Sequence, residues 1–556
     1  MDRLLGLGTT IDRRRLLGGA GAGALGLTTV ALIGCSSEGE EGTDVTPSSS
    51  ATSSASASAS ATATADPNAP KRGGIALIDA VEPNFGLLVT SVTNVVATMQ
   101  ESMFDRLIRQ GANFTPELSA AETYEWNDDF TKLTVKLKPG LEFHDGKPIT
   151  ADTIRETIEW FVSDKSGANQ VKQPLSDVAT NVIDDHTIEI TTPEPRPWLD
   201  DTMTLMWIVD VETIDTIADA KVVNGSGPFK FKSYTPQVGY ELERFEKYHV
   251  AEQPYLDGIT AKILPDQSAR DLAIQTGDIQ WMRNVPFSSV KALTNDDNVS
   301  VQIVTPGGMS GVNTIGMVVD HPALADPRVR LAFAYALDVD QIASDWTDGI
   351  ITEGWRWPWA PGSAGDRAAR DAGVADAVSY DPEKAKGLLA EAGYDTGMTL
   401  PIQIPSIQDR TVFVQLVQSY LQDIGVNLDI QVMETAAFMD SFRKRELEAL
   451  YFTPTSSASR MHPATMFNGN IMGQPNVSHV QTEAFSDFRA KVNVLDPHSA
   501  EGQANLAEFA RLWSQDDPFM LAVVPNGNQV AARSELKNWQ TVDDRATIPG
   551  EWWLDA

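Results

Sequence analysis

The order of apolar and polar residues along the chain predicts a mixture of strands and helices. A short apolar run at residues 73–80 (GGIALIDA), bounded by glycine and followed by Pro83, predicts a strand that ends in a turn. From about Ser91 to Ile108, apolar residues recur at helical spacing and predict one buried helix face. That face consists of Val92, Val95, Val96, Met99, Met103, Phe104 and Leu107.

The following stretch carries local signals for a strand, a turn and a helix. Residues 133–138 (LTVKLK) alternate strictly between apolar and polar side chains, which predicts a half-buried strand. A turn at Pro139-Gly140 follows, and Thr150 is the expected N-cap of a helix that runs to Phe161.

Another helix is predicted within Asp326–Asp338 (DPRVRLAFAYALD). Pro327 stands in its first turn, where a proline costs little. We interpret its apolar face as core, not as a site. The face consists of Val329, Phe333, Ala336 and Leu337.

The first 35 residues have the three parts of a secretory signal. Arg13 and Arg14 belong to a positive region, residues 16–34 carry no charge, and Cys35 follows Leu-Ile-Gly. The sequence DRRRLL resembles the twin-arginine signal, which exports folded proteins, and LIGC resembles a bacterial lipobox. We therefore expect residues 1–35 to be a signal peptide with a lipobox, and Cys35 to carry a lipid.

The alternative for this segment is an uncleaved membrane helix at residues 16–34, although its many Gly and Ala residues contribute little transfer energy. The export route stays open between the twin-arginine and the general pathway.

Residues 36–70 are rich in Ser, Ala and Thr without an aromatic residue, and predict a disordered tether. A small helical element is the alternative for the tether.

Composition and charge exclude some classes of function. The net charge of −33 argues against a nucleic-acid partner, because phosphate binding needs clustered Lys and Arg. The single cysteine allows no internal disulfide, and the 42% of hydrophobic residues suffices for the cores of two or three domains.

Several segments, in the same order, resemble the family-5 solute-binding proteins of ABC importers, the peptide and nickel binding group. The resemblance covers nearly everything from Gly73 to the C-terminus. The segments are 133–152 (LTVKLKPGLEFHDGKPITAD), 224–234 (NGSGPFKFKSY), 240–248 (YELERFEKY), 254–259 (PYLDGI), 273–279, 326–338 and 380–394 (YDPEKAKGLLAEAGY).

The resemblance implies an α/β fold of the two-lobed periplasmic-binding-protein type (class II, cluster C), with an extra inserted subdomain. Hinges are expected at two crossings, near Thr305–Gly308 and near Asp517-Pro518. The expected divisions are 73–110, 222–307 and 519–556 for the first lobe, 111–221 for the inserted subdomain and 308–518 for the second lobe.

The implied function is that of an extracytoplasmic receptor without cofactor. It would be a monomer, anchored in the membrane through Cys35 on the outer face of a bacterial cytoplasmic membrane. It would hold a peptide or small-molecule ligand between its lobes and pass it to an ABC permease and its ATPase.

Candidate ligand contacts come from two places. Trp355, Trp357 and Trp359 lie in a Pro/Gly loop, and we expect that they cannot all turn inward to one core. Some would then line the interlobe cleft, the alternative being packing against the lobe. Asn84 and Phe85, after the first strand, face the same cleft in relatives.

The chain departs from the family at the end of the stretch 451–463. Peptide-binding members commonly have Asp-Pro there, and the carboxylate pairs with the amino terminus of the peptide. Here His462 precedes Pro463, so a charged hydrogen bond of about 1.5–3 kcal/mol is lost. Arg460 and His462 would suit an anionic or hydroxyl-rich ligand better, although Arg460 could also be a solvated surface residue.

Nothing in the sequence favours an enzyme. His144-Asp145 lies in a turn, and Ser288–Lys291 fits the Ser-x-x-Lys motif without its companion motifs. The seven histidines show no metal-ligand spacing. The alternatives that stay open are an oligosaccharide or other non-peptide ligand, a secreted lipid-anchored hydrolase, and a lipid-anchored sensor or chaperone-like binder without a permease.

Overall fold

The computed structural model describes most of the chain beyond residue 68. Cys35, Arg13, Arg14 and Arg460 lie outside the described residues, so the roles assigned to them stay predictions. The described residues are 9–11, 69–90, 96–111, 114–166, 169–303, 311–374, 378–407, 409–454, 462–467, 476–526, 529–541 and 547–555.

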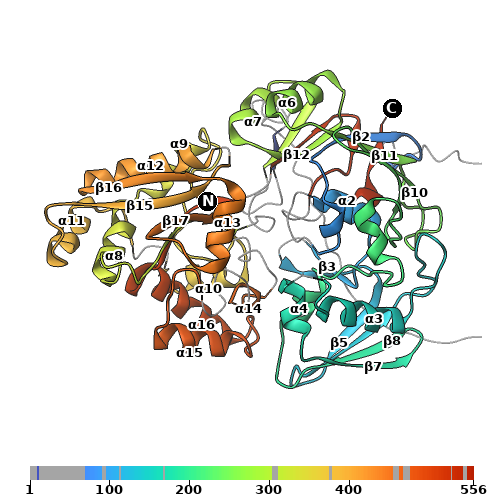
Figure 1. Ribbon diagram of the computed structural model, residues 1–556, viewed down its shortest axis with the longest axis horizontal. Coiled ribbons are helices and arrows are strands. Elements are labelled where there is room, and N and C mark those ends of the chain that lie inside the picture. The colour runs from blue at the N-terminus through green and yellow to red at the C-terminus, as the bar shows by residue number, and fades with distance from the viewer. Residues whose placement is uncertain are drawn as a thin grey trace, which may run out of the picture. The chain divides into compact units, whose positions relative to one another are not determined.

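The first lobe is built on an eight-stranded mixed sheet (Figure 1). Its strands are β1 (Thr9–Ile11), β2 (Ile75–Ala80), β9 (Phe229–Thr235), β10 (Gly239–Arg244), β11 (Gly258–Ile263), β12 (Trp281–Val285), β13 (Val299–Ile303) and β19 (Gln529–Arg533). Their order is β1-β13-β19-β12-β2-β11-β10-β9. The predicted strand at residues 73–80 is β2, which runs parallel to both of its neighbours, whereas the other pairs are antiparallel.

Short helices and a small strand pair complete this lobe. They are η1 (Phe85–Leu87), α2 (Ala97–Met103), η4 (Ile214–Asp219), α6 (Gln267–Thr276), α7 (Phe287–Leu293), η8 (Pro549–Glu551), and the paired strands β20 (Leu536–Lys537) and β21 (Trp553–Leu554).

The helix expected over 91–108 is too long at its C-terminal end. It ends as α2 at Met103, whose carbonyl accepts hydrogen bonds from the backbone N–H groups of Ser226 and Gly227, at 3.0 and 2.9 Å. Ile108 instead begins a strand, β3 (Ile108–Gln110), which pairs with β4 (Pro116–Leu118).

Residues 121–191 form a separate four-stranded antiparallel sheet, within the range expected for the inserted subdomain. Its strands are β5 (Ala121–Trp126), β6 (Lys132–Leu137), β7 (Ala179–Asp184) and β8 (Thr187–Thr191), in the order β5-β6-β8-β7. The helices α3 (Ala151–Val162), α4 (Asn169–Leu175) and α5 (Leu199–Met203) accompany it. Thr150 caps α3 through a capping box with Thr153, which confirms the prediction.

The second lobe is built on a five-stranded sheet with the order β16-β15-β17-β14-β18. Its strands are β14 (Gly311–Met317), β15 (Met398–Pro405), β16 (Val426–Met433), β17 (Leu450–Pro454) and β18 (Met520–Asn526). Its helices are α8 (Pro327–Ala336), α9 (Val339–Trp346), α10 (Ala364–Asp371), α11 (Pro382–Glu391), α12 (Arg410–Asp423), α13 (Thr435–Lys444), α14 (Ala464–Phe467), α15 (Glu483–Val492), α16 (Ala500–Arg511) and the π-helical η7 (Leu512–Asp516). The predicted helix face of α8 is buried, as expected of core.

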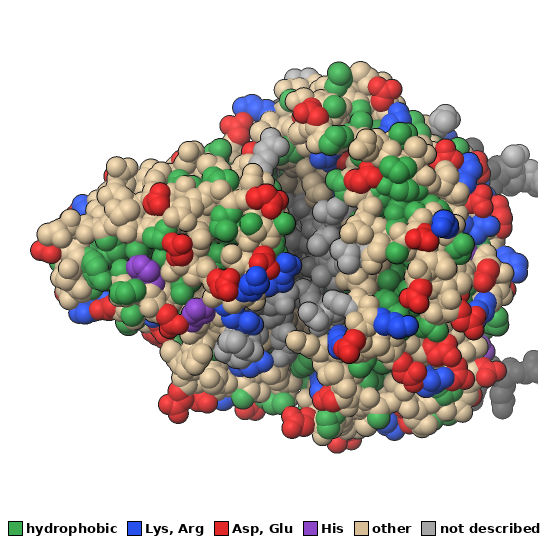
Figure 2. All heavy atoms as spheres, in the orientation of Figure 1, with side chains coloured by type: hydrophobic (Ala, Val, Ile, Leu, Met, Phe, Trp, Pro, Cys, Tyr) green, Lys and Arg blue, Asp and Glu red, His purple; other side chains and the backbone are tan. Residues whose placement is uncertain are grey.

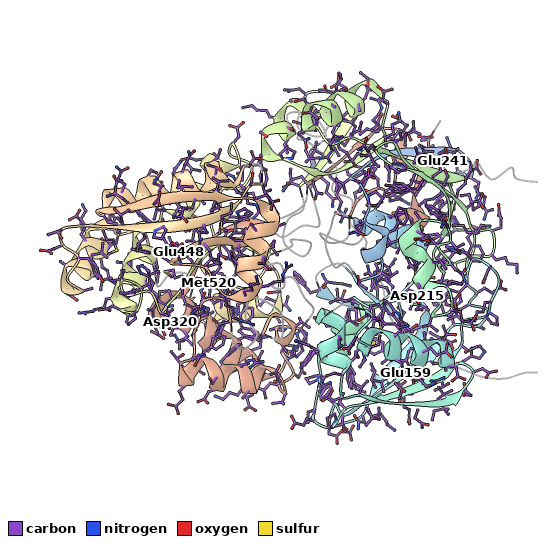
Figure 3. All side chains as sticks on the ribbon, in the orientation of Figure 1. Glu159, Asp215, Glu241, Asp320, Glu448 and Met520 are labelled. Carbon is purple, nitrogen blue, oxygen red and sulfur yellow. The ribbon has the colours of Figure 1, made fainter. Side chains whose placement is uncertain are left out.

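The expected second crossing between lobes, at Asp517-Pro518, is wrong. Met520 begins β18, which pairs with β14 inside the five-stranded sheet, and lies among the elements of that lobe in Figure 3. The chain leaves this sheet after Asn526 and enters the eight-stranded sheet at Gln529. The first crossing lies between β13 and β14, outside the described residues.

None of the helices in the described part of the chain combines the length and apolar character needed to span a bilayer.

Candidate functional site

The carboxyl ends of three parallel strands form the candidate site in the second lobe. β15 runs parallel to β16 on one side and to β17 on the other. β15 leads into α12, β16 leads into α13, and β17 leads into the stretch that ends at His462. In open α/β sheets, ligands bind outside the carboxyl ends of such strands.

Arg410 is a cation at this edge for which the described residues supply no counter-ion. It is the first residue of α12, and its guanidinium lies over the ring of Phe452 in β17, 4.5 Å from the ring centroid. Burial lowers its pKa to about 10. Among the described residues no carboxylate pairs with it. A half-buried charge without a partner is costly, so the arrangement favours an anionic group supplied from outside.

Sequence reasoning missed Arg410, although one signal was available. A cation in the first turn of a helix opposes the helix dipole, which is an unfavourable position for it. Such a residue directly after a strand end is a candidate for anion binding.

Apolar side chains are exposed around the same strand ends. They come from the loop after β15, from the first turn of α12, from the end of β16 and from α13, and they are between 40% and 53% exposed. Exposed apolar side chains near a ligand-binding edge are candidates for contact with a ligand. The residues are Ile407, Val412, Val432 and Met439.

The three tryptophans of the Pro/Gly loop all pack inside the second lobe. Trp355 Nε1 donates to the carbonyl of Trp359 at 2.7 Å, and Trp357 Nε1 donates to Asp366 Oδ1 at 3.1 Å. The guanidinium of Arg370 lies over both Trp355 and Trp357. The expectation that they cannot all turn inward is wrong, because the neighbouring rings share one core. A ligand contact by this loop stays a prediction.

Asn84 and Phe85 lie at the start of η1. The side chain of Asn84 caps η1 by accepting a hydrogen bond from the N–H of Gly86 at 3.1 Å. Phe85 is buried and packs against Phe231 and Tyr234, with ring centroids 5.7 and 4.9 Å away. A ligand contact by either residue stays a prediction.

His462 does not have the free ring nitrogen that an anionic or hydroxyl-rich ligand would need. Its Nδ1 accepts from the N–H of Ala464 at 3.0 Å, and its Nε2 faces the carbonyl of Leu495 at 3.3 Å. Burial lowers its pKa to about 3, so it is neutral. His462 therefore stabilises the start of α14.

Hydrogen bonds join the start of α5 to the second lobe. Thr465 Oγ1 donates to Asp201 Oδ2 at 2.8 Å, and Trp198 Nε1 donates to the carbonyl of Asn493 at 3.1 Å. The neighbouring Asp200 is half-buried. Burial, and then the charge of Asp201, raise the pKa of Asp200 to about 7.

Asp200→Asn is expected to stabilise the protein in a pH-dependent way. The pKa of Asp200 is raised in the folded state. The protonated carboxyl group therefore contributes fully to the free energy of unfolding below pH 4, and this contribution is lost as the pH rises through 7. An amide carries no charge, so the variant should gain about 2 kcal/mol at pH 8 and little at pH 4. Urea unfolding at both pH values measures this difference. Equal gains at the two pH values would contradict it, and Asp215→Asn, at an exposed position, is the control.

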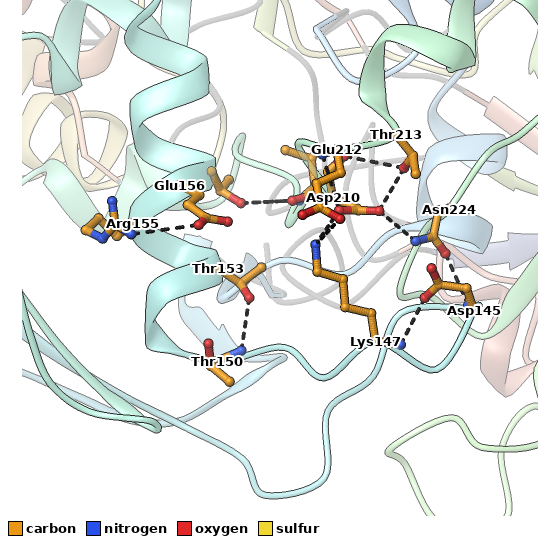
Figure 4. Close-up of polar contacts among 12 residues, drawn as sticks. Asp145, Lys147, Thr150, Thr153, Arg155, Glu156, Asp210, Glu212, Thr213 and Asn224 are labelled. Carbon is orange, nitrogen blue, oxygen red and sulfur yellow. Dashed lines mark hydrogen bonds and ion pairs between the residues drawn. The ribbon is translucent and has the colours of Figure 1, made fainter.

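The signature motif of residues 133–152 supplies scaffold contacts (Figure 4). Asp210 is buried and accepts from Lys147 at 3.0 Å, and from Thr213 and Asn224 at 2.9 Å each. Burial would raise the pKa of Asp210, but these hydrogen bonds outweigh it and lower the pKa. The motif is thereby tied to the Asn224-Gly-Ser-Gly segment.

His144 is held in the same way. Its Nε2 donates to the carbonyl of Gly227 at 3.0 Å, and its Nδ1 accepts from the N–H of Gly225 at 3.2 Å. Burial lowers its pKa to about 4. Both ring nitrogens are occupied, so His144 serves as a structural contact in this turn. In the described part of the chain, no group of His, Cys, Asp and Glu has a metal-binding arrangement.

Comparison with known protein families identifies the architecture. The family model "Bacterial extracellular solute-binding proteins, family 5 Middle" matches residues 115–469, more than half of the chain. The chain belongs to this family. Its members are extracytoplasmic solute-binding receptors, not enzymes.

Two curated relatives of this family-5 protein illustrate the degree of similarity. The oligopeptide-binding protein AppA of Bacillus subtilis is 28% identical over 410 residues, which cover 67% of this chain and 71% of AppA. The glutathione-binding protein GsiB of Pectobacterium atrosepticum is 26% identical over 320 residues, covering 56% of this chain and 60% of GsiB.

Solved structures of low sequence identity share the two-lobed α/β fold. The substrate-binding protein CtaP of Listeria monocytogenes superposes with a TM-score of 0.75 at 22% identity, covering 87% of this chain and all of CtaP. AppA of Bacillus subtilis, in complex with a nonapeptide, gives 0.69 at 20% identity and covers 88% of this chain and all of AppA.

Proposed function

We propose that this protein is the lipid-anchored receptor of an ABC importer. It captures a peptide or peptide-like ligand with a free carboxylate between its lobes and delivers it to the permease and its ATPase. Relatives named as peptide-binding proteins support the importer role. Mass spectrometry of the mature amino terminus tests the lipid on Cys35, and an unmodified or uncleaved terminus would refute the anchor.

One observation carries the choice of ligand: the half-buried cation of Arg410 at the carboxyl edge of β15 and β17. A carboxylate would supply the missing counter-ion, and the exposed apolar groups beside it suit the side chains of a peptide. A neutral oligosaccharide offers hydroxyl groups but no charge, which makes it the weaker candidate. The missing Asp before Pro463 means that the amino terminus of a peptide contributes less here than the carboxyl end.

Arg410→Met is expected to weaken the binding of peptides with a free carboxyl terminus about 10- to 100-fold, the loss of one charged hydrogen bond. It should leave binding of the same peptides as carboxyl-terminal amides nearly unchanged. Calorimetric titration of ligand-free protein with matched acid and amide peptides measures both. The unfolding midpoint should not fall, because the substitution removes a charge that lacks a partner in the described protein.

Arg443→Met is the matched control, since Arg443 is exposed on α13. Binding of acids and amides with equal affinity by the unchanged protein would refute the role of Arg410. An absence of binding to any peptide would refute the proposed function itself.

A further inference from the structure

A groove on the second lobe lies between α15 and α16 and reaches η7. Its volume is about 420 Å³, within the range of small-molecule sites. The groove shares no residue with the strand ends described above. Its floor includes Phe488 and Phe509, whose rings are stacked 4.1 Å apart.

The stacked rings fix which residues face one another across the groove. A short connection joins α15 to α16, so the two helices form an antiparallel hairpin. With Phe488 opposite Phe509, Lys491 comes opposite Asn505 one turn further along α15. Asp487 and Glu508 line the groove on the other side of Lys491 and Asn505, and Glu483 and Asp516 line it toward η7.

Among the described residues, no cation pairs with the carboxylates of the groove, although Arg511 also lines it. Asp487 and Lys491 have the i,i+4 spacing at which opposite charges commonly pair, yet they do not pair here. Within the described ranges, Glu483, Glu508 and Asp516 form no ion pair either. Acidic side chains are spread over the viewed face of the molecule, in keeping with the net charge of −33 (Figure 2).

At the end of the groove near Lys491, the side chain of Asn505 has a hydrogen-bond donor without an acceptor among the described residues. Its side chain is 5% exposed, and its Nδ2 has no hydrogen-bond partner in the part of the chain that the structure describes. A buried donor without an acceptor is destabilising. Asn505 and Lys491 both line the groove. The amide of Asn505 and the ammonium of Lys491 are hydrogen-bond donors, so a carboxylate bound at this end would accept from both.

We propose that this groove binds a basic amino acid or the equivalent end of a basic peptide. Lys491 and Asn505 bind the α-carboxylate, and Asp487 and Glu508 bind the side-chain cation. Positions 487 and 491 are four residues apart on α15, which corresponds to about 6 Å along the helix axis. The extended four-carbon side chain of lysine spans a similar distance and lies over the two phenylalanine rings.

Three matched ligands test the proposal by calorimetry at low ionic strength, in the Arg410→Met background so that the strand-end site contributes little. Lysine should bind saturably at one site. Cadaverine lacks the carboxylate and norleucine lacks the side-chain cation, so each should bind at least 10-fold more weakly. Equal binding of lysine and cadaverine would reveal general attraction of cations to an acidic protein and would overturn the proposal.

Paired substitutions locate the site. Asp487→Asn with Glu508→Gln should weaken lysine binding at least 10-fold. Glu391→Gln with Asp423→Asn makes the same charge change at exposed positions on α11 and α12 and should leave binding unchanged. Equal losses in both double variants, or no binding of lysine to the starting protein, would refute the proposed binding of lysine in the groove.

A comparison of free lysine with a peptide that ends in a carboxyl-terminal lysine, in the same assay, shows whether the groove takes the free amino acid or the end of a peptide.

Discussion

Gly225→Ala is expected to destabilise the protein by more than about 3 kcal/mol, beyond the usual cost of overpacking. A Cβ atom at Gly225 would lie 1.8 Å from the carbonyl oxygen of Met103, and backbone cannot move aside as a flexible side chain can. The same carbonyl caps α2 by accepting from Ser226 and Gly227. The substitution would therefore disturb both the end of α2 and the contacts of His144.

Thermal and urea unfolding midpoints measure this effect. Gly387→Ala is the matched control, because an added Cβ there has no neighbour within 4 Å and Gly387 lies in the middle of α11. It should stabilise the protein by about 0.5–1 kcal/mol. A Gly225→Ala variant that unfolds at the same midpoint as the unchanged protein would show that the close approach is not real.

Arg330→Met should cost about 3–5 kcal/mol, the expected effect of breaking a buried ion pair. Arg330 is 4% exposed. Its guanidinium donates to the carbonyls of Pro518 at 2.8 Å and Ala325 at 3.1 Å, and it also contacts the carbonyl of Leu324 and the carboxylate of Asp517. Removing it leaves several acceptors without a donor at the entry to β18.

Two further variants separate the effect of the positive charge of Arg330 from the effect of its hydrogen-bond geometry. Arg328→Met removes an exposed arginine that pairs with Asp326, and should cost less than about 1 kcal/mol. Arg330→Lys keeps the charge but loses the planar fork of donors, so its midpoint should fall between those of the other two variants. If Arg330→Met and Arg328→Met were equally stable, the buried contacts would carry no net energy.

The parts of the fold that sequence reasoning predicted well depend on local signals. The capping box at Thr150 and the Asp326-Pro327 start of α8 involve residues within one turn of each other. The helix over 91–108 was predicted too long because its end depends on Ser226 and Gly227, more than a hundred residues away. The apolar spacing alone carries no information about that contact.

Long-range contacts also explain what local signals missed at the site and at the lobe boundary. Pro518 is a local signal for a bend, but β18 belongs to the second sheet through its pairing with β14. The family resemblance implies that His462 stands where peptide-binding members commonly have an acid, but it does not reveal that both ring nitrogens are occupied. Arg410 became a candidate only through its burial over Phe452, which depends on β17 lying next to β15.

The position of β19 has a consequence for biosynthesis. β19 lies between β12 and β13, and pairs with both. Until residues 529–533 leave the ribosome, these two strands have open edges and the eight-stranded sheet is unfinished. The five-stranded sheet is contained within residues 311–526 and can be complete earlier. The lobe that begins first along the chain is therefore finished last.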